Sequence, residues 1–381
     1  MSNIIKGLIY DLIIFFACKG KRIENRKEKV LLLRVDEIGD YILWRKFIFE
    51  ILNSHTCFQK EVHFIGNESW KKLFYLEFDS SNFKNIYWFN KNKFKTSIIY
   101  RFKFSRMIYL ENFSTVINPT YSRAKRVDDS IVKAARAKSN FGFVRNNENY
   151  LAYEQNFDKS LYNNLYEIKN KHSFEFDKNK KFAEWFCEKS INIFSINFNE
   201  ETFSTAKFEN LPKNYFIVFP GSRSSTRIWN TDYFIEVSNY IYKKYKLTAV
   251  ICGGNGDMVY ANNFINKYAH PFIDLTSKTS LPELLFIIKK ASCLISVDTG
   301  SIHLAASVNC LTLGIFNGSQ YGRFSPYPKE ICSKIISFYP KQVREDVGKN
   351  NLSKYELICD IPYDKVTSQE VIDFLETNSI L

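Results

Sequence analysis

The sequence predicts an α/β protein made of two doubly wound domains, each a parallel sheet with helices on its faces. The chain has 381 residues, too many for one ordinary core and enough for two domains. Short apolar runs alternate with helical segments, which is typical of parallel sheets. A polar, Asn-rich stretch at about 188–212 interrupts the alternation, which then restarts. We therefore expect two similar domains in succession.

The first domain is expected at 28–200. Apolar runs at 30–35 (VLLLRV), 62–65 and 113–117 predict strands, and a helical run follows the first strand from 41 to about 52. Residues 66–110 give no clear pattern.

The second domain is expected at 201–381. Strands are predicted at 215–219, 247–252, 272–275, 293–297 and 312–316. Helices are predicted at 231–245, 258–268, 281–290, from 301 to 307, and, as a closing helix, at 368–375. Ligands bind beyond the carboxyl ends of the strands in open α/β sheets, so two such domains facing one another predict a central cleft.

The N-terminal segment 1–27 is strongly apolar from 4 to 18 and then basic from 19 to 29. A secretory signal would carry its charge before the apolar stretch. The stretch is also short for a membrane span and contains Asp11. An interfacial helix with a basic collar and an ordinary helix packed on the first domain both fit.

The chain carries a formal net charge of +13, which favours an anionic partner. Lys and Arg are spread over the whole length without a nucleic-acid motif, so a nucleic-acid partner is not expected. A phosphorylated glycolipid and the inner face of the inner membrane fit better, and a generically solvated lysine-rich surface remains the alternative. The eight cysteines form no CxxC pair, which argues against zinc and for a reducing cytoplasm.

The strongest motif is SVDTGSIHLAA at 296–306, where a buried strand runs into a helix. Asp298 and Thr299 can cap the helix, and Gly300 allows a ligand to approach its free N–H groups. A helix N-terminus of this kind suits a diphosphate. His303 lies one turn further and is expected to face the same ligand. A capped helix with a packed histidine is the alternative.

A second loop, PGSRSSTRIW at 220–229, also joins a strand to a helix. Its hydroxyl groups and two arginines suit phosphate oxygens, although the arginines could simply be solvated. The turn GGNGD at 253–257 fails as a dinucleotide fingerprint, because the third glycine would fall at Val259. It still fits a tight turn near a nucleotide.

The loop RVDEIGD at 34–40 places three carboxylates at the carboxyl end of the first strand. With no metal-binding histidine close in sequence, these groups suit base catalysis on a sugar hydroxyl. Helix capping by Asp40 is the alternative.

These segments resemble glycosyltransferase family 9, the bacterial heptosyltransferases. The resemblance rests on VLLLRVDEIGDYILW, FPGSRSSTRIW, GGNGD, TSLPELLFIIKKASCLISVDTGSIHLAAS and GIFNGSQYGRFSPY, which occur in that family's order and spacing. It covers about 28–375 and is thin at 66–110 and 145–210. The five blocks together are specific, whereas each alone would be weak.

The resemblance implies a GT-B fold of two Rossmann-like domains, an ADP-heptose donor and inverting transfer to a lipopolysaccharide core. Asp40 matches the family's proposed catalytic base. The matching donor-binding residues are Ser222, Arg227, Asp298, Thr299, Gly300 and His303. Thr279 falls at the adenine pocket, where its side chain differs from the family's. Gly256 falls where a family member can place an acidic residue at the ribose, and Asp257, one position further on, could substitute for it.

On the acceptor side, a basic loop follows the strand at 113–117. Its polar and basic residues are Asn118, Tyr121, Arg123, Lys125 and Arg126. Such a loop could bind phosphate or an acidic sugar of a lipid-linked core, or it could be the start of a surface helix.

The function predicted from the sequence is therefore transfer of heptose from ADP-heptose to a lipopolysaccharide core in the cytoplasm, without a metal or other cofactor. One alternative is a related transferase with another nucleotide sugar, or with protein or capsule as acceptor. A non-catalytic sugar-nucleotide-binding protein is the other.

Overall fold

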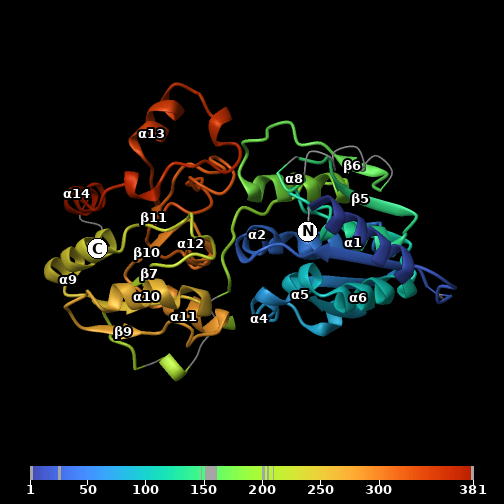
Figure 1. Cartoon of the computed structure of the whole chain (residues 1–381), viewed down its shortest axis with the longest axis horizontal. Coiled ribbons are helices and arrows are strands. Elements are labelled where there is room, and N and C mark those ends of the chain that lie inside the picture. Colours follow the sequence, from blue (N-terminus) through green and yellow to red (C-terminus); the bar gives the residue numbers. More distant parts are fainter. Residues whose placement is uncertain are drawn as a thin grey trace. The chain divides into compact units, whose positions relative to one another are not determined.

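A computed structural model of the protein divides the chain into two compact units (Figure 1). Unit 1 comprises Met1–Asn170 and Phe176–Ile193, and unit 2 comprises Lys171–Glu175 and Phe194–Leu381. The chain therefore enters unit 2 briefly before it completes unit 1, which the single boundary predicted at residue 200 did not anticipate. The structure describes residues 3–24, 27–146, 148–150, 161–199, 202–203, 206–208 and 210–378.

Unit 1 contains a six-stranded parallel sheet in the order β3-β2-β1-β4-β5-β6. The predicted strands at 30–35, 62–65 and 113–117 are confirmed as β1, β2 and β4. The strand order reverses between β1 and β4, which creates a topological switch point there. The strands are β1 Lys29–Arg34, β2 Glu61–Asn67, β3 Asn85–Phe89, β4 Thr115–Asn118, β5 Ser139–Phe143 and β6 Asn164–Tyr166.

The helices of unit 1 cover this sheet. The predicted helix at 41–52 is two helices, α2 and α3, separated by a 3-10 turn at Arg45–Phe47. The N-terminal helix α1 packs beside α6 and α7 within its own unit (Figure 1). The helices are α1 Asn3–Ala17, α2 Ile38–Trp44, α3 Ile48–Leu52, α4 Lys71–Phe74, α5 Lys91–Thr96, α6 Ile98–Glu111, α7 Asp128–Ala135 and α8 Glu175–Cys187.

Unit 2 repeats this topology with the strand order β12-β11-β10-β7-β8-β9 and parallel pairing throughout. Its switch point lies between β7 and β10. All five predicted strands are confirmed, and β12 is an additional edge strand. The strands are β7 Tyr215–Phe219, β8 Thr248–Ile251, β9 Phe272–Asp274, β10 Leu294–Val297, β11 Thr312–Ile315 and β12 Ile335–Phe338.

The helices of unit 2 have clear local signals. Ser280 and Glu283 form a reciprocal capping box at the start of α11, with a proline in its first turn. The apolar side chains of α11 are buried at the spacing of one helix face. The helices are α9 Thr231–Tyr245, α10 Met258–Ile265, α11 Leu281–Lys290, α12 Gly300–Ala306, α13 Lys341–Gly348 and α14 Ser368–Asn378.

No helix in the described part of the chain is long and apolar enough to cross a membrane.

Candidate functional site

The switch point of unit 2 gathers the three loops that were predicted to hold the donor. Strand β7 lies between β10 and β8 in the sheet. Because all three strands are parallel, the loops that follow them emerge at one edge. The segments 220–230, 252–257 and 298–299 therefore lie in neighbouring positions at the carboxyl end of this sheet.

Arg227 joins two of these loops. Its Nη1 lies 3.5 Å from Asp298 Oδ2 and 3.4 Å from the Asp298 carbonyl oxygen. Burial raises the pKa of Asp298, and the Arg227 guanidinium opposes that rise. The Arg227 side chain remains 31% exposed, so the site presents a held but accessible cation. Such a guanidinium can bind phosphate oxygens.

Helix α12 begins at Gly300, directly beyond this ion pair. Thr299 occupies the N-cap position, but its side chain makes no capping bond to the helix. Its hydroxyl instead lies 2.7 Å from Ser301 Oγ, which is 2.7 Å from Ser296 Oγ. The expectation that the Thr299 side chain caps the helix is therefore wrong, because a hydroxyl cluster holds that side chain.

His303 is buried in the interior of unit 2. Its Nδ1 lies 2.5 Å from Tyr327 Oη, and the Phe324 ring meets it edge-on. Burial lowers the pKa of His303 to about 4, so the imidazole is neutral at neutral pH. These contacts favour the packed histidine over the ligand-facing one that the sequence analysis expected.

Asp257 shapes the turn after β8. Its Oδ2 accepts a bond from the Gly254 N–H at 2.7 Å, and burial raises its pKa. A Cβ atom at Gly221 would come within 2.4 Å of Asp257 Oδ1, and one at Gly253 within 2.9 Å of Asp257 Cβ. The glycines therefore allow the loops after β7 and β8 to meet on this carboxylate. A contact of Asp257 with ribose stays a prediction.

Two further predicted donor residues lie in or after these loops. Ser222 is buried, and its Oγ accepts a 3.3 Å bond from the Ser224 N–H. Thr279 is half-buried and directly precedes Ser280, the N-cap of α11. Ser222 therefore lies within the gathered loops, and Thr279 lies just before the helix that follows β9.

The switch point of unit 1 carries the predicted catalytic loop. Asp40 is half-buried in the first turn of α2, and its Oδ2 accepts a 3.3 Å bond from the Glu37 N–H. Asp40 and Glu37 thus form a reciprocal capping box. The alternative considered from the sequence, that Asp40 caps a helix, is therefore confirmed for α2. The carboxylate of Asp40 takes part in this capping box, and its role as a base stays a prediction.

Arg34 is a buried cation at the start of this loop. Its structural role was not expected from the sequence. Its Nε lies 2.6 Å from Asp36 Oδ2, and its Nη1 donates to the Pro119 carbonyl at 2.7 Å. The guanidinium thereby joins the loops after β1 and β4. Burial raises the pKa of Asp36 well above its usual value, and Arg34 opposes that shift while the Asp40 charge adds to it.

The predicted acceptor residues divide into two groups. Asn118 donates to Tyr162 Oη at 2.8 Å, Tyr162 donates to Asp129 at 2.9 Å, and Arg123 Nε lies 3.1 Å from the same Asp129 oxygen. Both Asn118 and Arg123 are buried in this network. The structure therefore gives these two residues a role in the fold, and their contact with an acceptor stays a prediction.

Of the other predicted acceptor residues, two lie nearer the surface and the third lies beside Lys178, a lysine that was not among the predicted site residues. Lys125 and Arg126 are half-buried. Tyr121 is buried, and the Nζ of Lys178 lies 4.5 Å from its ring centroid. Lys178 and Asn179 come from α8, and Asn179 Oδ1 accepts a 3.1 Å bond from Arg34. Arg34 and Asn179 are 145 residues apart, so no local sequence pattern linked α8 to the loop after β1.

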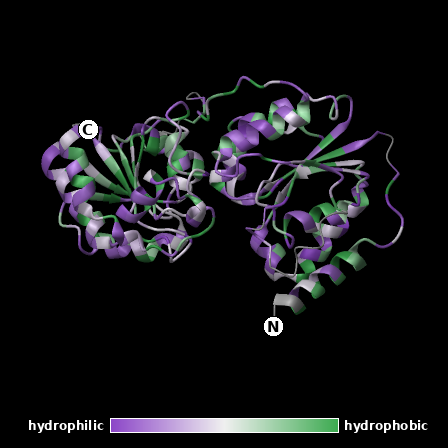
Figure 2. Cartoon of the chain, turned by 90° about the horizontal axis from the view of Figure 1, so that it is seen from above, coloured by the Kyte–Doolittle hydropathy of each residue, from purple (hydrophilic) through white to green (hydrophobic). Residues whose placement is uncertain are grey.

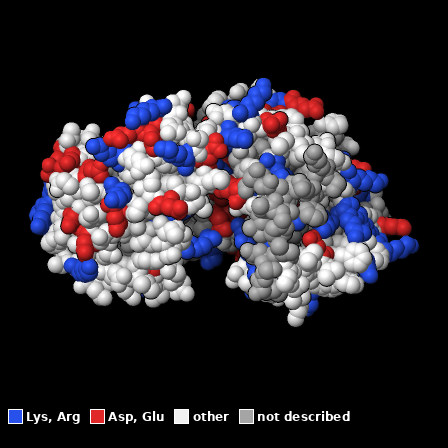
Figure 3. Space-filling view, turned by 45° about the horizontal axis from the view of Figure 1, so that its top comes forward, with Lys and Arg blue, Asp and Glu red and all other residues white. Residues whose placement is uncertain are grey.

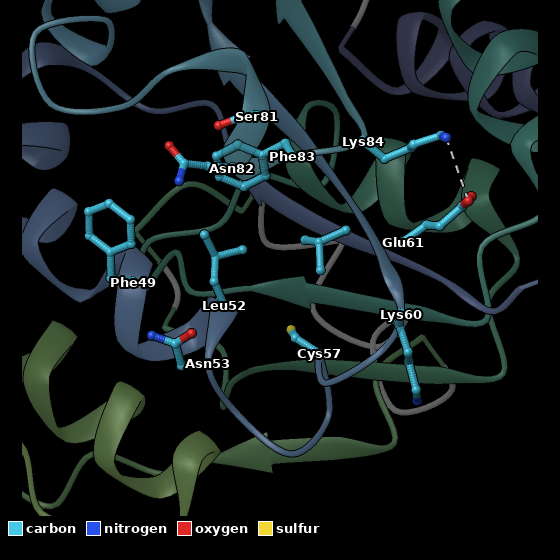
Figure 4. Close-up of a pocket in the computed structure, with 11 residues that line it drawn as sticks. Phe49, Leu52, Asn53, Cys57, Lys60, Glu61, Ser81, Asn82, Phe83 and Lys84 are labelled. Atoms are coloured by element: carbon cyan, nitrogen blue, oxygen red, sulfur yellow. Dashed lines mark ion pairs between the residues drawn. The ribbon is translucent and has the colours of Figure 1, made fainter.

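A hollow of about 620 Å³ lies elsewhere in unit 1 (Figure 4). Leu52 and Asn53 line one side, and Asn82 and Phe83 line another. It sits where β2 and β3 begin, whereas Asp40 follows the carboxyl end of β1. Because the sheet is parallel, the hollow is at the opposite edge from the candidate site.

Charged side chains are mixed on the surface of unit 2, where Lys and Arg lie among Asp and Glu on the face drawn in Figure 3. Within the described ranges, no three His, Cys, Asp or Glu side chains gather in a way that could hold a metal ion. Independence of metal stays a prediction.

Comparison with known proteins agrees with this arrangement. The sequence profile of glycosyltransferase family 9 (heptosyltransferase) matches residues 133–351, more than half of the chain. Lipopolysaccharide heptosyltransferase 3 of Escherichia coli K12 is 24% identical over 140 residues, 36% of this chain and 41% of that protein. The chain thus matches about two fifths of the length of its curated relatives.

Solved structures share the fold over nearly the full length. A glycosyl transferase family 9 protein from Veillonella parvula DSM 2008 superposes with a TM-score of 0.64 at 15% identity, covering 93% of this chain and 97% of that one. Escherichia coli heptosyltransferase WaaC with ADP-2-deoxy-2-fluoro heptose gives 0.62 at 14% identity, covering 92% and 99%. The predicted fold class, α/β with two Rossmann-like units of the GT-B type, is confirmed. The chain belongs to glycosyltransferase family 9, the heptosyltransferase family.

Proposed function

We propose that this protein transfers a heptose from ADP-heptose to a lipopolysaccharide core acceptor, with inversion at the anomeric carbon. The observation that carries the proposal is that the two units of this family 9 chain hold complementary groups at their switch points. One holds a carboxylate, Asp40, at the start of a helix. The other holds an accessible cation, Arg227, beside the N-terminus of α12.

In the proposed reaction, an acceptor hydroxyl attacks the anomeric carbon as the bond to the diphosphate oxygen breaks. Asp40 takes the hydroxyl proton, and the electron pair of the broken bond leaves with ADP. Attack from the face opposite the diphosphate inverts the centre. Arg227, Ser222 and the first N–H groups of α12 stabilise the charge that develops on the departing diphosphate.

The names of similar proteins support the choice of donor and acceptor. The WaaC structures contain ADP or ADP-2-deoxy-2-fluoro heptose, and the curated relatives are lipopolysaccharide heptosyltransferases. A site for this chemistry would work in the cytoplasm, where nucleotide sugars are available. The proposed acceptor loop carries Asn118 and Arg123, which are also bonded within unit 1, together with Tyr121, Lys125 and Arg126.

Thermal denaturation with nucleotides tests the donor assignment. ADP at 100 times its dissociation constant should stabilise the folded protein by about 2.7 kcal/mol. UDP and GDP at the same concentrations should stabilise it much less. An equal or larger shift with UDP would favour a different nucleotide sugar.

Turnover separates an enzyme from a sugar-nucleotide-binding protein. Release of ADP from ADP-heptose should depend on a heptose-deficient lipopolysaccharide core and should be absent with protein or capsule acceptors. Binding of ADP-heptose without any acceptor-dependent ADP release would contradict the proposal and favour the non-catalytic alternative.

A further inference from the structure

Helix α1 is apolar on two opposite faces. The inner face is buried within unit 1 through Tyr10, Ile14 and Ala17. The outer face repeats at helical spacing and exposes about half or more of each side chain. These side chains are Ile5 (49%), Leu8 (60%), Leu12 (55%), Phe15 (52%) and Phe16 (54%). A helix that is apolar all round normally has a partner on every side.

The neighbouring helix α6 also exposes apolar side chains. Ile98, Ile99 and Phe102 in its first turns are 59%, 67% and 39% exposed. The two helices are packed together, and the Arg101 guanidinium lies 3.8 Å from the Tyr10 ring centroid. That contact places the start of α6 beside the middle of α1. We call these eight side chains on the two helices the α1/α6 face.

The concentration of apolar side chains on this face is unusual within the described part of the chain. Other exposed large apolar residues occur singly or in pairs, such as Phe58 and the pair Leu357 and Ile358. Scattered residues of that kind are normal on protein surfaces, whereas a contiguous group marks a binding surface. The helix beside the N label in Figure 2 is α1, and apolar green segments recur along it.

The surroundings of the face are positively charged. The Lys19 ammonium lies 4.9 Å and 4.7 Å from the ring centroids of Phe15 and Phe16. Lys21 and Lys103 are also exposed. Asp11, the one acidic residue in the sequence of α1, is paired with Lys133 at 2.7 Å. Exposed apolar side chains accompanied by lysines on the same two helices and the segment after α1 complement a bilayer with negatively charged headgroups.

We propose that the α1/α6 face docks on the surface of a bilayer that contains anionic lipid, with α1 lying in the interfacial plane. The apolar side chains enter the boundary between headgroups and acyl chains, and the lysines contact lipid phosphates. This inference does not depend on which sugar the protein transfers. A second copy of the chain fits less well, because a two-fold interface would bring the lysine rims of both copies together.

Substitutions on the outer face test the proposal better than deletion of the segment. Deletion of residues 1–27 would also remove Tyr10 and Ile14 from the interior of unit 1, so lost binding could reflect misfolding. Leu8→Gln with Leu12→Gln changes two exposed side chains and keeps good helix formers. The matched control is Leu357→Gln with Ile358→Gln, which are similarly exposed in unit 2.

The measurement is flotation of the full chain with vesicles of phosphatidylcholine containing about one third phosphatidylglycerol. The Leu8 and Leu12 double variant should bind at least about tenfold more weakly, and the control should bind like the unchanged protein. Equal binding by the two double variants would overturn the proposal. If the first variant has a lowered melting temperature, Ile98→Gln with Ile99→Gln tests the same face from α6.

The charged rim has its own test. Binding should weaken between 50 and 500 mM NaCl and on vesicles of phosphatidylcholine alone, because screening and loss of anionic lipid remove the same attraction. Lys19→Gln with Lys21→Gln should reproduce that loss, whereas Lys341→Gln with Lys349→Gln should not. Light scattering detects a dimer, in which a second copy of the chain covers the face instead of lipid. The lipid assignment would be contradicted if the protein did not bind vesicles and instead formed a dimer that the Leu8→Gln, Leu12→Gln double variant did not form.

Discussion

The two units share one strand order, and the loops at their switch points nevertheless hold opposite kinds of chemistry. In unit 1, the buried Arg34 lies beneath the carboxylates Asp36 and Asp40. In unit 2, a hydroxyl cluster at the start of α12 lies beside the partly exposed cation Arg227. The parallel sheet fixes where each site lies, and the loop residues decide whether the site suits proton removal or anion binding.

The strongest test of this comparison removes the cation from the carboxylate site. Arg34→Met should lower the free energy of unfolding by about 3–5 kcal/mol, because it leaves Asp36 buried without its partner. Chemical denaturation measures the loss. Arg45→Met, which removes another buried arginine paired with Glu77, should destabilise similarly while leaving turnover per folded molecule unchanged. Equal turnover in both variants would mean that Arg34 does not position the catalytic loop.

The second test removes the proposed base. Asp40→Asn keeps an oxygen that can accept from the Glu37 N–H, so α2 should stay capped. Turnover should nevertheless fall by roughly 100-fold or more while the dissociation constant of ADP changes little. Glu37→Gln serves as the control in the same capping box. Near-normal turnover by Asp40→Asn would transfer the role of base to Asp36 or Glu37.

The third test addresses the anion site of unit 2. Arg227→Ala should raise the dissociation constant of ADP by about 10- to 100-fold, the range for a lost hydrogen bond to a charged group, and should lower turnover as well. Arg227→Lys should recover part of both. Arg223→Ala, an exposed arginine of the same loop, should bind ADP normally. Titration calorimetry gives the constants, and loss of ADP affinity in Arg223→Ala alone would move the site along the loop.

The fourth test concerns the pH dependence of stability and His303, whose pKa burial lowers to about 4. The unfolded chain binds this proton near its ordinary pKa of about 6.5, so protonation favours the unfolded state below that pH. The contribution of His303 to stability is complete above pH 6.5 and is lost as pH falls towards 4. The slope is at most about 1.4 kcal/mol per pH unit. His303→Gln should show a shallower decline in denaturation midpoints over this window, and an unchanged slope would mean that the imidazole is accessible.

The sequence determined most of the α/β organisation because its signals are local. Runs such as VLLLRV mark strands buried on both faces, and the Ser280 cap with its proline marks the start of α11. The order of the motifs also indicated the family and the loops that carry the candidate donor site. Residues 66–110 gave no such signal. Strand β3 is only half-buried along most of its length, and α6 has apolar side chains on its outer side as well as its inner side.

Only the tertiary structure decided which polar residues are available to a ligand. Asn118 and His303 carry the right chemistry in the right loops, yet each is held by a partner that is distant in sequence. The same holds for α1, whose apolar residues look alike in the sequence until packing against α6 buries one face and exposes the other. The reason is physical: burial and pairing depend on contacts between segments far apart in the chain, and local sequence patterns do not encode them.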